Sequence, residues 1–120
     1  MKLYHYPNCS TCRKARTFLS KIEAQVELIN LAEQAPSVTE LRFMLECYEG
    51  QIKKLFNTSG VQYRELNMKT RLPELSAEQA LELLASNGLL VKRPFLLTQN
   101  TAQPKGLVGF NEQQWSDVLL

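Results

Sequence analysis

The start of the chain changes its hydrophobic period twice, and this change constrains the fold more than any other feature of the sequence. Residues 3–6 (LYHY) are typical of a short strand, and Pro7-Asn8 ends it. Over residues 10–21, apolar side chains recur at steps of three and four, as on one face of a helix. Residues 25–31 are apolar and β-branched enough for a second strand. A strand, a helix and a strand within about 30 residues predict a right-handed βαβ unit with parallel strands.

The middle of the chain, residues 37–88, has helical patterns. Ser37-Val-Thr-Glu40 and Ser76-Ala-Glu-Gln79 are capping-box sequences, each of which is typical of a helix start. The first of these helices is expected to end at Gly50, and Gly88 is expected to be the C′ residue of the second. The apolar face of the first predicted helix consists of Val38, Leu41, Leu45 and Tyr48.

The last part of the chain returns to the period of a strand. Residues 95–98 and 107–110 flank a polar loop at 99–105, which predicts an antiparallel hairpin. Asn111 is a suitable N-cap for a final helix. This helix is expected to bury Trp115, Val118 and Leu119. A βαβ unit joined to a ββα unit predicts an α/β protein with a thioredoxin-like fold, a mixed sheet and a mostly helical insertion at about residues 37–88.

Length and composition agree with one domain over residues 1–120. The chain has 120 residues, of which 44% are hydrophobic and 22% charged, as in ordinary globular proteins. A net charge of +2 is too small to indicate a nucleic-acid partner. The sequence has neither an apolar run near the roughly 20 residues of a membrane span nor a signal-peptide pattern. We therefore expect a cytoplasmic monomer with no membrane partner.

Cys9 and Cys12 form a Cys-x-x-Cys pair at the start of the first predicted helix. Cys9 falls at the N-cap, and Cys12 lies one turn later on the same face, within reach of a disulfide. The free N–H groups of Thr11 and Cys12, together with the helix dipole, favour a thiolate at Cys9. A thiolate with a second thiol beside it is suited to thiol–disulfide exchange, because the second thiol resolves the mixed disulfide.

Other interpretations of the cysteines remain open. Both can be small buried side chains, or they can be half of a zinc site, for which only Cys47 and His5 remain as soft ligands. No second Cys-x-x-Cys is present, and we therefore expect no metal. His5 lies four residues before Cys9, where it either assists ionisation of the thiol or is a half-buried strand residue with a satisfied ring. Cys47 is expected to be a small buried hydrophobic residue rather than a third redox thiol.

Arg93-Pro94 precedes the strand at residues 95–98. In a thioredoxin-type fold this turn lies opposite the Cys-x-x-Cys pair. A cis bond before Pro94 would bring the backbone close to the sulfur, and Arg93 would then meet a thiolate or another anion. An ordinary trans turn with a solvated arginine is the alternative.

The chain resembles the arsenate reductase-like family, which includes the Spx and MgsR regulators. The resemblance is carried over nearly the whole length by YHYPNCSTCRKA (4–15), KLFNTSGVQYRELNMK (54–69), LLVKRPFLL (89–97) and VGFNEQQW (108–115). It implies a thioredoxin-like fold with a helical insertion, Cys9 as the attacking cysteine, and Arg93 facing it before a cis Pro94. His5 matches a histidine near the nucleophile of the arsenate reductases.

The sequence also departs from this family's arsenate reductases. The glutaredoxin-linked enzymes bind the oxyanion with three arginines, whereas two of those positions hold Asn57 and Gly109 here. A hydrogen bond to a charged group is worth about 1.5–3 kcal/mol, so weak arsenate binding is expected. Spx-type regulators keep the Cys-x-x-Cys pair and bind the C-terminal domain of the RNA polymerase α subunit. Gly50 lies where those regulators carry a glycine at that contact, although a helix C-terminus also explains it.

These observations predict a cytoplasmic thiol–disulfide oxidoreductase that resembles arsenate reductases. Cys9 is the expected nucleophile, Cys12 the resolving thiol and Arg93 the anion contact, with His5, Thr11 and Pro94 in support. The expected reaction cycle passes through a redox-active disulfide, needs no bound cofactor, and takes its electrons from glutathione, glutaredoxin or thioredoxin. The alternative is an Spx-type redox-sensing regulator that binds RNA polymerase α.

Overall fold

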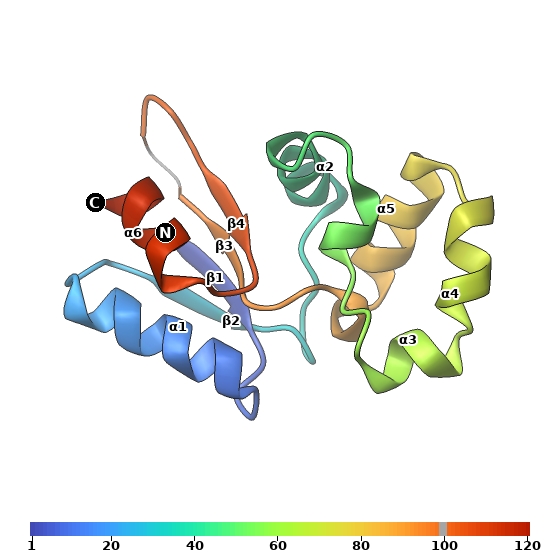
Figure 1. Cartoon of the computed structure of the whole chain (residues 1–120), viewed down its shortest axis with the longest axis horizontal. Helices are drawn as coiled ribbons and strands as arrows, with labels where there is room; N and C mark the ends of the chain where they lie inside the picture. Colours follow the sequence, from blue (N-terminus) through green and yellow to red (C-terminus); the bar gives the residue numbers. More distant parts are fainter. Residues whose placement is uncertain (99–100) are drawn as a thin grey trace.

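The computed structural model, which describes residues 1–98 and 101–120, shows a four-stranded mixed sheet with helices on both faces (Figure 1). The strands and α-helices are β1 (Lys2–His5), α1 (Ser10–Lys21), β2 (Glu27–Asn30), α2 (Val38–Cys47), α3 (Val61–Glu65), α4 (Met68–Arg71), α5 (Ala77–Ser86), β3 (Phe95–Leu97), β4 (Gly106–Val108) and α6 (Glu112–Leu119). Three short 3₁₀-helices are η1 (Ile52–Leu55), η2 (Leu72–Glu74) and η3 (Gly88–Leu90).

The sheet has the strand order β2-β1-β3-β4. β1 runs parallel to β2 and antiparallel to β3, and β3 and β4 form an antiparallel pair. The registers place Leu3 opposite Leu28 on one side and opposite Leu96 on the other. The predicted α/β class, with a βαβ unit joined to a ββα unit, is therefore confirmed. The first two residues of the predicted loop at 99–105 lie outside the described residues.

Alternation along the strands divides the core between the two faces of the sheet. Leu3, Leu96 and Leu107 belong to a cluster that α1 and α6 cover, with Trp115 fully buried in it. Tyr4 and Phe95 belong to a second cluster on the opposite face. In Figure 1, α1 and α6 lie on one side of the sheet, and α2 to α5 lie on the other.

Side chains fix the start of three helices as the sequence predicts. The Ser37 Oγ accepts a hydrogen bond from the Glu40 N–H at 3.1 Å, and the Glu40 carboxylate accepts one from the Ser37 N–H at 3.0 Å. Ser76 heads a second capping box in front of α5. The Asn111 Oδ1 caps α6 by accepting from the Gln114 N–H at 2.9 Å. Each cap satisfies donors that a helix N-terminus leaves free.

Two predictions about helix ends and faces are wrong. Gly88 is not a left-handed C′ residue, because it begins η3, and a Cβ there would lie 2.1 Å from the carbonyl oxygen of Leu31. Close approach of two backbones therefore explains this glycine. Val118 is 36% exposed, because α6 is short and turns only Trp115 fully into the core.

The predicted face of α2 packs against the core, but only part of it is fully buried. Leu41 and Met44 are its buried residues, whereas Leu45 and Tyr48 pack only partly against the cluster. Cys47, predicted to be buried, is exposed. Its side chain lies beside Gly106 of β4 instead of under the sheet.

Candidate functional site

The turn between β1 and α1 places Cys9 at the N-cap of the helix. The Cys9 N–H donates to the carbonyl of Tyr6 at 3.0 Å, and the Cys9 carbonyl accepts from Arg13 at 3.0 Å. The Cys9 backbone is extended, with φ −84° and ψ 121°, and its side chain does not act as a cap. The sulfur instead accepts hydrogen bonds from the N–H groups of Thr11 and Cys12. The first turn of α1 thus directs its free donors at this sulfur.

The two thiols have opposite pKa shifts. Partial burial acts to raise the pKa of Cys9, but hydrogen bonds from Cys12 and Thr11 and the charge of Arg93 outweigh it, so that this pKa lies below its usual value. Burial, with the hydrogen bond and charge of Cys9, raises the pKa of Cys12 to about 11. Cys9 is partly exposed, whereas Cys12 is fully buried, and both are free thiols. The arrangement favours a thiolate at Cys9 beside a protonated thiol at Cys12.

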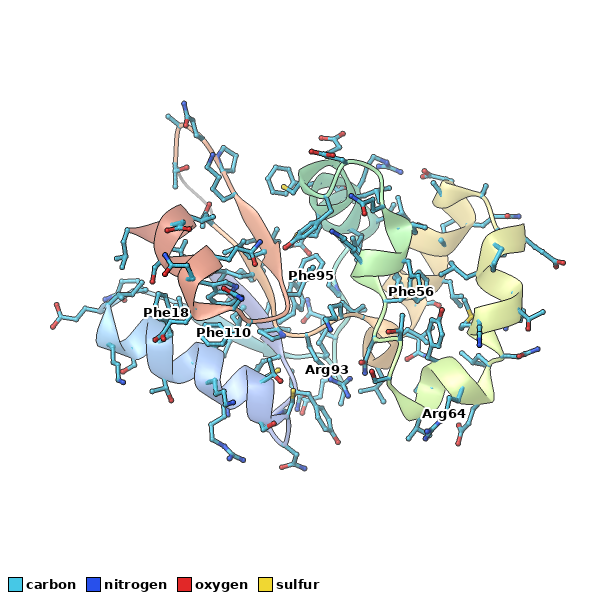
Figure 2. The ribbon with its side chains drawn as sticks, viewed as in Figure 1. Phe18, Phe56, Arg64, Arg93, Phe95 and Phe110 are labelled. Carbon is cyan, nitrogen blue, oxygen red and sulfur yellow. The ribbon has the colours of Figure 1, made fainter. Side chains whose placement is uncertain are left out.

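Arg93 faces Cys9 from the loop before β3. Its guanidinium carbon lies 5.0 Å from the centroid of the Tyr6 ring, and its Nη1 donates to the Leu89 carbonyl at 3.4 Å. The Arg93-Pro94 bond is cis, as predicted. Figure 2 shows Arg93 between the N-terminal end of α1 and the helices on the other side of the sheet.

Backbone hydrogen bonds hold this loop on both sides. The Lys92 N–H donates to the Leu55 carbonyl at the end of η1, at 2.8 Å. The Gly109 N–H donates to the Pro94 carbonyl, also at 2.8 Å, and extends the pairing of β3 with β4. The position of Arg93 therefore depends on η1, β3 and β4 together.

Cys9 and Arg93 line one open cleft with a volume of about 680 Å³. Thr11, Asn57 and Gly109 also line it. The structure thus brings together the two positions at which arginines were expected, and neither Asn57 nor Gly109 supplies a charge there. Asn57 lies close to Gly60, where an added Cβ would meet the Asn57 Nδ2 at 2.6 Å.

Several predicted residues lie outside the cleft. His5 is buried, and its Nδ1 is 2.9 Å from an Arg16 nitrogen. Burial and the charge of Arg16 lower the pKa of His5. Pro94 is buried and does not line the cleft. Gly50 is exposed after α2, with φ +80° and no atom within 4 Å of an added Cβ.

Sequence reasoning missed two residues of the site. Tyr6 supplies the ring under Arg93, the acceptor for the Cys9 N–H, and a backbone donor to the Cys12 sulfur. Lys92 lines the cleft next to Arg93. The sequence carries no signal for the ring of Tyr6, because its partner is far along the chain, but the charge of Lys92 beside Arg93-Pro94 was visible.

The described residues contain neither a metal-binding cluster nor a helix that could cross a membrane. No three His, Cys, Asp or Glu side chains within residues 1–98 and 101–120 gather in a way that would hold a metal ion. Within the same residues, none of the helices has the length and apolar character needed to cross a membrane.

Comparison with known proteins identifies the family. The model of the ArsC family matches residues 4–118. The uncharacterized YusI protein of Bacillus subtilis is 44% identical over 117 residues, which is 98% of this chain and 96% of YusI. The global transcriptional regulator Spx of Enterococcus faecalis is 32% identical over 114 residues, covering 95% of this chain and 82% of the regulator.

Solved structures agree with this assignment. An ArsC family related protein from Bacteroides fragilis superposes with a TM-score of 0.86 at 37% identity, covering 98% of this chain and 95% of that chain. A protein described as a possible arsenate reductase from Streptococcus mutans gives a TM-score of 0.84 at 36% identity, covering 96% of each chain. The chain belongs to the ArsC family, and its fold is the thioredoxin-like fold of that family.

Proposed function

We propose that this ArsC-family protein is a thiol–disulfide oxidoreductase in which Cys9 attacks and Cys12 resolves. The observation that carries the proposal is the geometry at the start of α1: the partly exposed Cys9 sulfur accepts hydrogen bonds from the N–H groups of Thr11 and Cys12, and the buried Cys12 sulfur lies in contact with it. These contacts lower the pKa of Cys9 and, with burial, raise that of Cys12. A nucleophile that is ionised while its resolving partner stays protonated is the state in which such a reaction begins.

The proposed reaction takes two steps. The Cys9 thiolate attacks one sulfur of a substrate disulfide, forms a mixed disulfide with it, and releases the other sulfur as a thiolate. Cys12 then loses its proton and attacks the Cys9 sulfur, which forms the Cys9–Cys12 disulfide and releases the second substrate thiolate. The substrate gains two electrons, and the protein dithiol loses them.

Other residues of the cleft have supporting roles in this proposal. The N–H of Thr11 stabilises the Cys9 thiolate. Arg93, held by Tyr6, meets the anionic part of the substrate or the departing thiolate. Pro94 follows Arg93 in the loop that places this arginine on the lining of the Cys9 cleft. His5 contributes through its contact with Arg16 rather than by moving a proton.

We propose that a thiol reductant of the cytoplasm regenerates the dithiol, either glutathione directly or a glutaredoxin or thioredoxin. The two sulfurs store both electrons, and the reaction therefore needs no bound cofactor. Arsenate is expected to be a poor substrate, because Asn57 and Gly109 offer no positive charge to the oxyanion.

A coupled assay tests the proposal. NADPH oxidation is followed with glutathione, glutathione reductase and either a glutathione mixed disulfide or arsenate as substrate. Wild type is expected to turn over the disulfide, Cys9→Ser to be inactive, and Cys12→Ser to stop at the mixed disulfide, visible by mass spectrometry. Absence of any adduct at Cys9 in the Cys12→Ser variant would refute the proposed oxidoreductase function.

A second candidate is an Spx-type redox regulator that binds the C-terminal domain of RNA polymerase α. One observation favours it: Gly50 lies exposed in a left-handed turn with open space in front of it, which leaves this surface free for a partner. A pull-down with that domain, in the reduced and the disulfide form of the protein, tests it. Lack of binding in both forms would remove this candidate.

A further inference from the structure

A groove lies between α1 and the start of α6, separate from the cleft of Cys9. Its volume is about 320 Å³. Cys9 is the N-cap of α1, and the groove begins about one helical turn further along the same helix. Figure 2 shows two of its side chains, Phe18 and Phe110, between α1 and α6. We call it the α1 groove, and its lining includes Arg13, Lys14, Phe18, Lys21, Phe110 and Glu112.

The charge of the α1 groove is positive. Arg13, Lys14 and Lys21 line it with exposed side chains, and Glu112 is the single acidic residue in the part of its lining that the structure describes. No salt bridge within residues 1–98 and 101–120 involves any of the three cations. A concave surface with charges mainly of one sign attracts groups of the opposite sign. The α1 groove is therefore suited to an anionic partner.

The stability of α1 does not explain where its cations lie. The helix contains no acidic residue, and Arg13 and Lys14 lie in its N-terminal half. The helix dipole favours acidic side chains near that end, and a glutamate four residues away would compensate a lysine. Lys21, in the last turn, does lie where the dipole favours a cation. Helix stability thus gives no reason for Arg13 and Lys14.

Ionisation of Cys9 does not explain these two cations either. Against its partial burial, the Cys9 thiolate is favoured by hydrogen bonds from Cys12 and Thr11 and by the charge of Arg93. These groups come from the first turn of α1 and from the loop before β3. The two cations that follow in α1 are exposed, and their charges are available to a partner.

Two aromatic side chains give the α1 groove an apolar part. The ring centroids of Phe18 and Phe110 lie 5.8 Å apart. Phe110 also packs against Trp115, with 5.0 Å between the ring centroids, which holds it at the start of α6. It is half-buried and lines the cleft of Cys9 as well as the α1 groove. An apolar side chain of a partner can therefore bind beside the charges.

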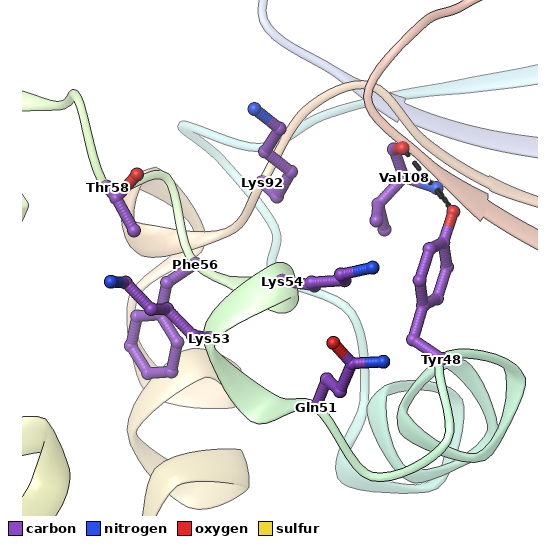
Figure 3. A pocket seen from close by; sticks show the side chains of 8 residues that line it. All are labelled: Tyr48, Gln51, Lys53, Lys54, Phe56, Thr58, Lys92 and Val108. Atoms are coloured by element: carbon purple, nitrogen blue, oxygen red, sulfur yellow. Dashed lines mark hydrogen bonds between the residues drawn. The ribbon is translucent and has the colours of Figure 1, made fainter.

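A second basic surface lies beside Tyr48 (Figure 3). Lys53, Lys54 and Lys92 line a cavity there, with a volume of about 440 Å³. The Lys54 Nζ lies 5.8 Å from the centroid of the Tyr48 ring, and Lys53 points the opposite way in the figure. These lysines come from η1 and the loop before β3, whereas the α1 groove belongs to the helix that carries Cys9. Lys54 therefore provides a matched control for the cations of α1.

We infer that the substrate of Cys9 is a protein disulfide with acidic residues close to its cysteine, and that this acidic segment binds in the α1 groove. The inference rests on the proposed function and adds the class of substrate. Carboxylates of the segment bind at Arg13, Lys14 and Lys21. An apolar side chain of the same segment binds at Phe110.

The length of the α1 groove favours a polypeptide over a small molecule. Lys21 lies about 18 Å from Cys9 along the helix axis, at a rise of 1.5 Å per residue. An extended chain of about five or six residues spans this distance. A small disulfide that reacts at Cys9 would reach Arg13, about 6 Å along the axis, but not Lys21. A protein segment reaches all three cations while its sulfur lies at Cys9.

The chemistry is that of the proposed reaction. The Cys9 thiolate forms a bond to one sulfur of the protein disulfide, the substrate's sulfur–sulfur bond breaks, and its other sulfur leaves as a thiolate. Cys12 then displaces the substrate, so that the dithiol loses the two electrons that the substrate gains. The cations of the α1 groove take no part in electron transfer. They bind the substrate next to Cys9 and select it by charge.

The test uses three disulfide peptides that differ only in charge. Each has one cysteine, joined by a disulfide to mercaptoethanol, and the same single phenylalanine. Within about six positions on either side of the cysteine, which is the span of the α1 groove, the other residues are Asp and Glu, Asn and Gln, or Lys. The reduced protein carries Cys47→Ser, so that Cys9 and Cys12 are its only thiols. Formation of the Cys9–Cys12 disulfide is followed by acid quenching, alkylation and mass spectrometry.

Wild type is expected to react faster with the acidic peptide than with the uncharged one. Arg13→Gln and Lys14→Gln are each expected to lower the ratio of these two rates about 3-fold, and the double variant about 10-fold, as for charge pairs near a surface. Lys14→Glu is expected to raise the rate of the lysine peptide relative to the uncharged one. Added salt is expected to weaken these effects.

Lys54→Gln is the control, because it removes the same charge outside the α1 groove. It is expected to change the ratio of the acidic to the uncharged rate by less than about 1.5-fold, since an exposed charge away from the peptide is screened.

Two kinds of result would overturn the inference, and they differ in what they leave standing. If Cys9 reacts with the uncharged peptide but the acidic peptide is no faster, the inference fails and the proposed function stands. The same holds if Lys54→Gln lowers the ratio as much as the variants of α1 do. If Cys9 reacts with none of the three peptides, the proposed function fails and the inference fails with it.

Discussion

At the scale of single residues, Tyr6 organises the site. Its carbonyl accepts the Cys9 N–H, its own N–H points to the Cys12 sulfur, and its ring supports Arg93. One residue thus connects the nucleophile, the resolving thiol and the arginine. Because two of these contacts are made by the backbone, only the contact to Arg93 depends on the side chain.

Ionisation of Cys9 gives the first prediction. Iodoacetamide is expected to modify Cys9 with a pH midpoint below about 8.5, the ordinary thiol value, while Cys12 stays unmodified at neutral pH because its pKa is about 11. Arg93→Ala removes a charge that favours the thiolate, so the midpoint is expected to rise. Lys21→Ala is the control and is expected to leave it in place. A wild-type midpoint at or above the ordinary value would contradict the assignment of Cys9 as nucleophile.

Burial of His5 gives the second prediction, which concerns the pH dependence of stability. Its pKa is lower in the folded protein than in the unfolded chain, so the unfolded chain binds more protons below the ordinary histidine value of about 6.5. The stability associated with neutral His5 is therefore present above that pH and is lost as the pH falls through the folded pKa. Urea unfolding at pH 7 and pH 5 is expected to show a smaller loss of stability in His5→Gln than in wild type. Equal losses would contradict the role of this side chain.

At the scale of elements, two glycines that both follow helices have different causes. Gly50 donates its N–H to the Leu45 carbonyl at 2.9 Å and has φ +80°, so it closes α2 by its backbone conformation. Gly88 has ordinary backbone angles and is required because η3 packs against the Leu31 carbonyl. In the sequence the two look alike, since each glycine simply follows a helical pattern.

The third prediction separates these causes. Gly50→Ala is expected to cost about 1 kcal/mol, the usual penalty of a left-handed residue with a Cβ, because nothing else lies within 4 Å. Gly88→Ala is expected to cost about 3 kcal/mol or more, because the new methyl group would displace the backbone of Leu31. Chemical denaturation measures both. A Gly88→Ala variant no less stable than Gly50→Ala would show that η3 is not packed in this way.

At the scale of the whole molecule, one thin sheet separates two hydrophobic clusters. α1 and α6 cover the cluster that contains Trp115, and α2 and α5 cover the cluster that contains Leu84. Neighbouring residues of β1 and β3 point alternately into the two clusters. Loss of either cluster therefore exposes one face of the strands that support the other.

The fourth prediction follows from this coupling. Leu84→Ala, which leaves a cavity in the cluster opposite Trp115, is expected to destabilise the protein by about 2–5 kcal/mol. Fluorescence of Trp115, the single tryptophan, is expected to change at the same denaturant concentration as the far-UV circular dichroism. Val118→Ala, at an exposed site, is the control and is expected to change stability by less than about 0.5 kcal/mol. Separate transitions for the two signals would mean that the clusters unfold independently.

The sequence alone predicted the features that depend on residues close together along the chain. The βαβ unit, the hairpin, the caps at Ser37, Ser76 and Asn111, and the N-cap position of Cys9 follow from local period and capping chemistry. The position of the Arg93-Pro94 turn opposite Cys9 follows from the fold and not from the local pattern. Its cis bond was an expectation of the family.

Only the tertiary structure decided the features that depend on packing between residues far apart in the sequence. Cys47 and Val118 are exposed, Met44 rather than Leu45 is fully buried on α2, and Gly88 is required by the approach of a distant backbone. Lys92, from the same loop as Arg93, lines both the cleft of Cys9 and a neighbouring cavity beside Tyr48. Side chains that meet across the fold share no period or spacing in the sequence. Their contacts arise only when the sheet and its two layers of helices are assembled.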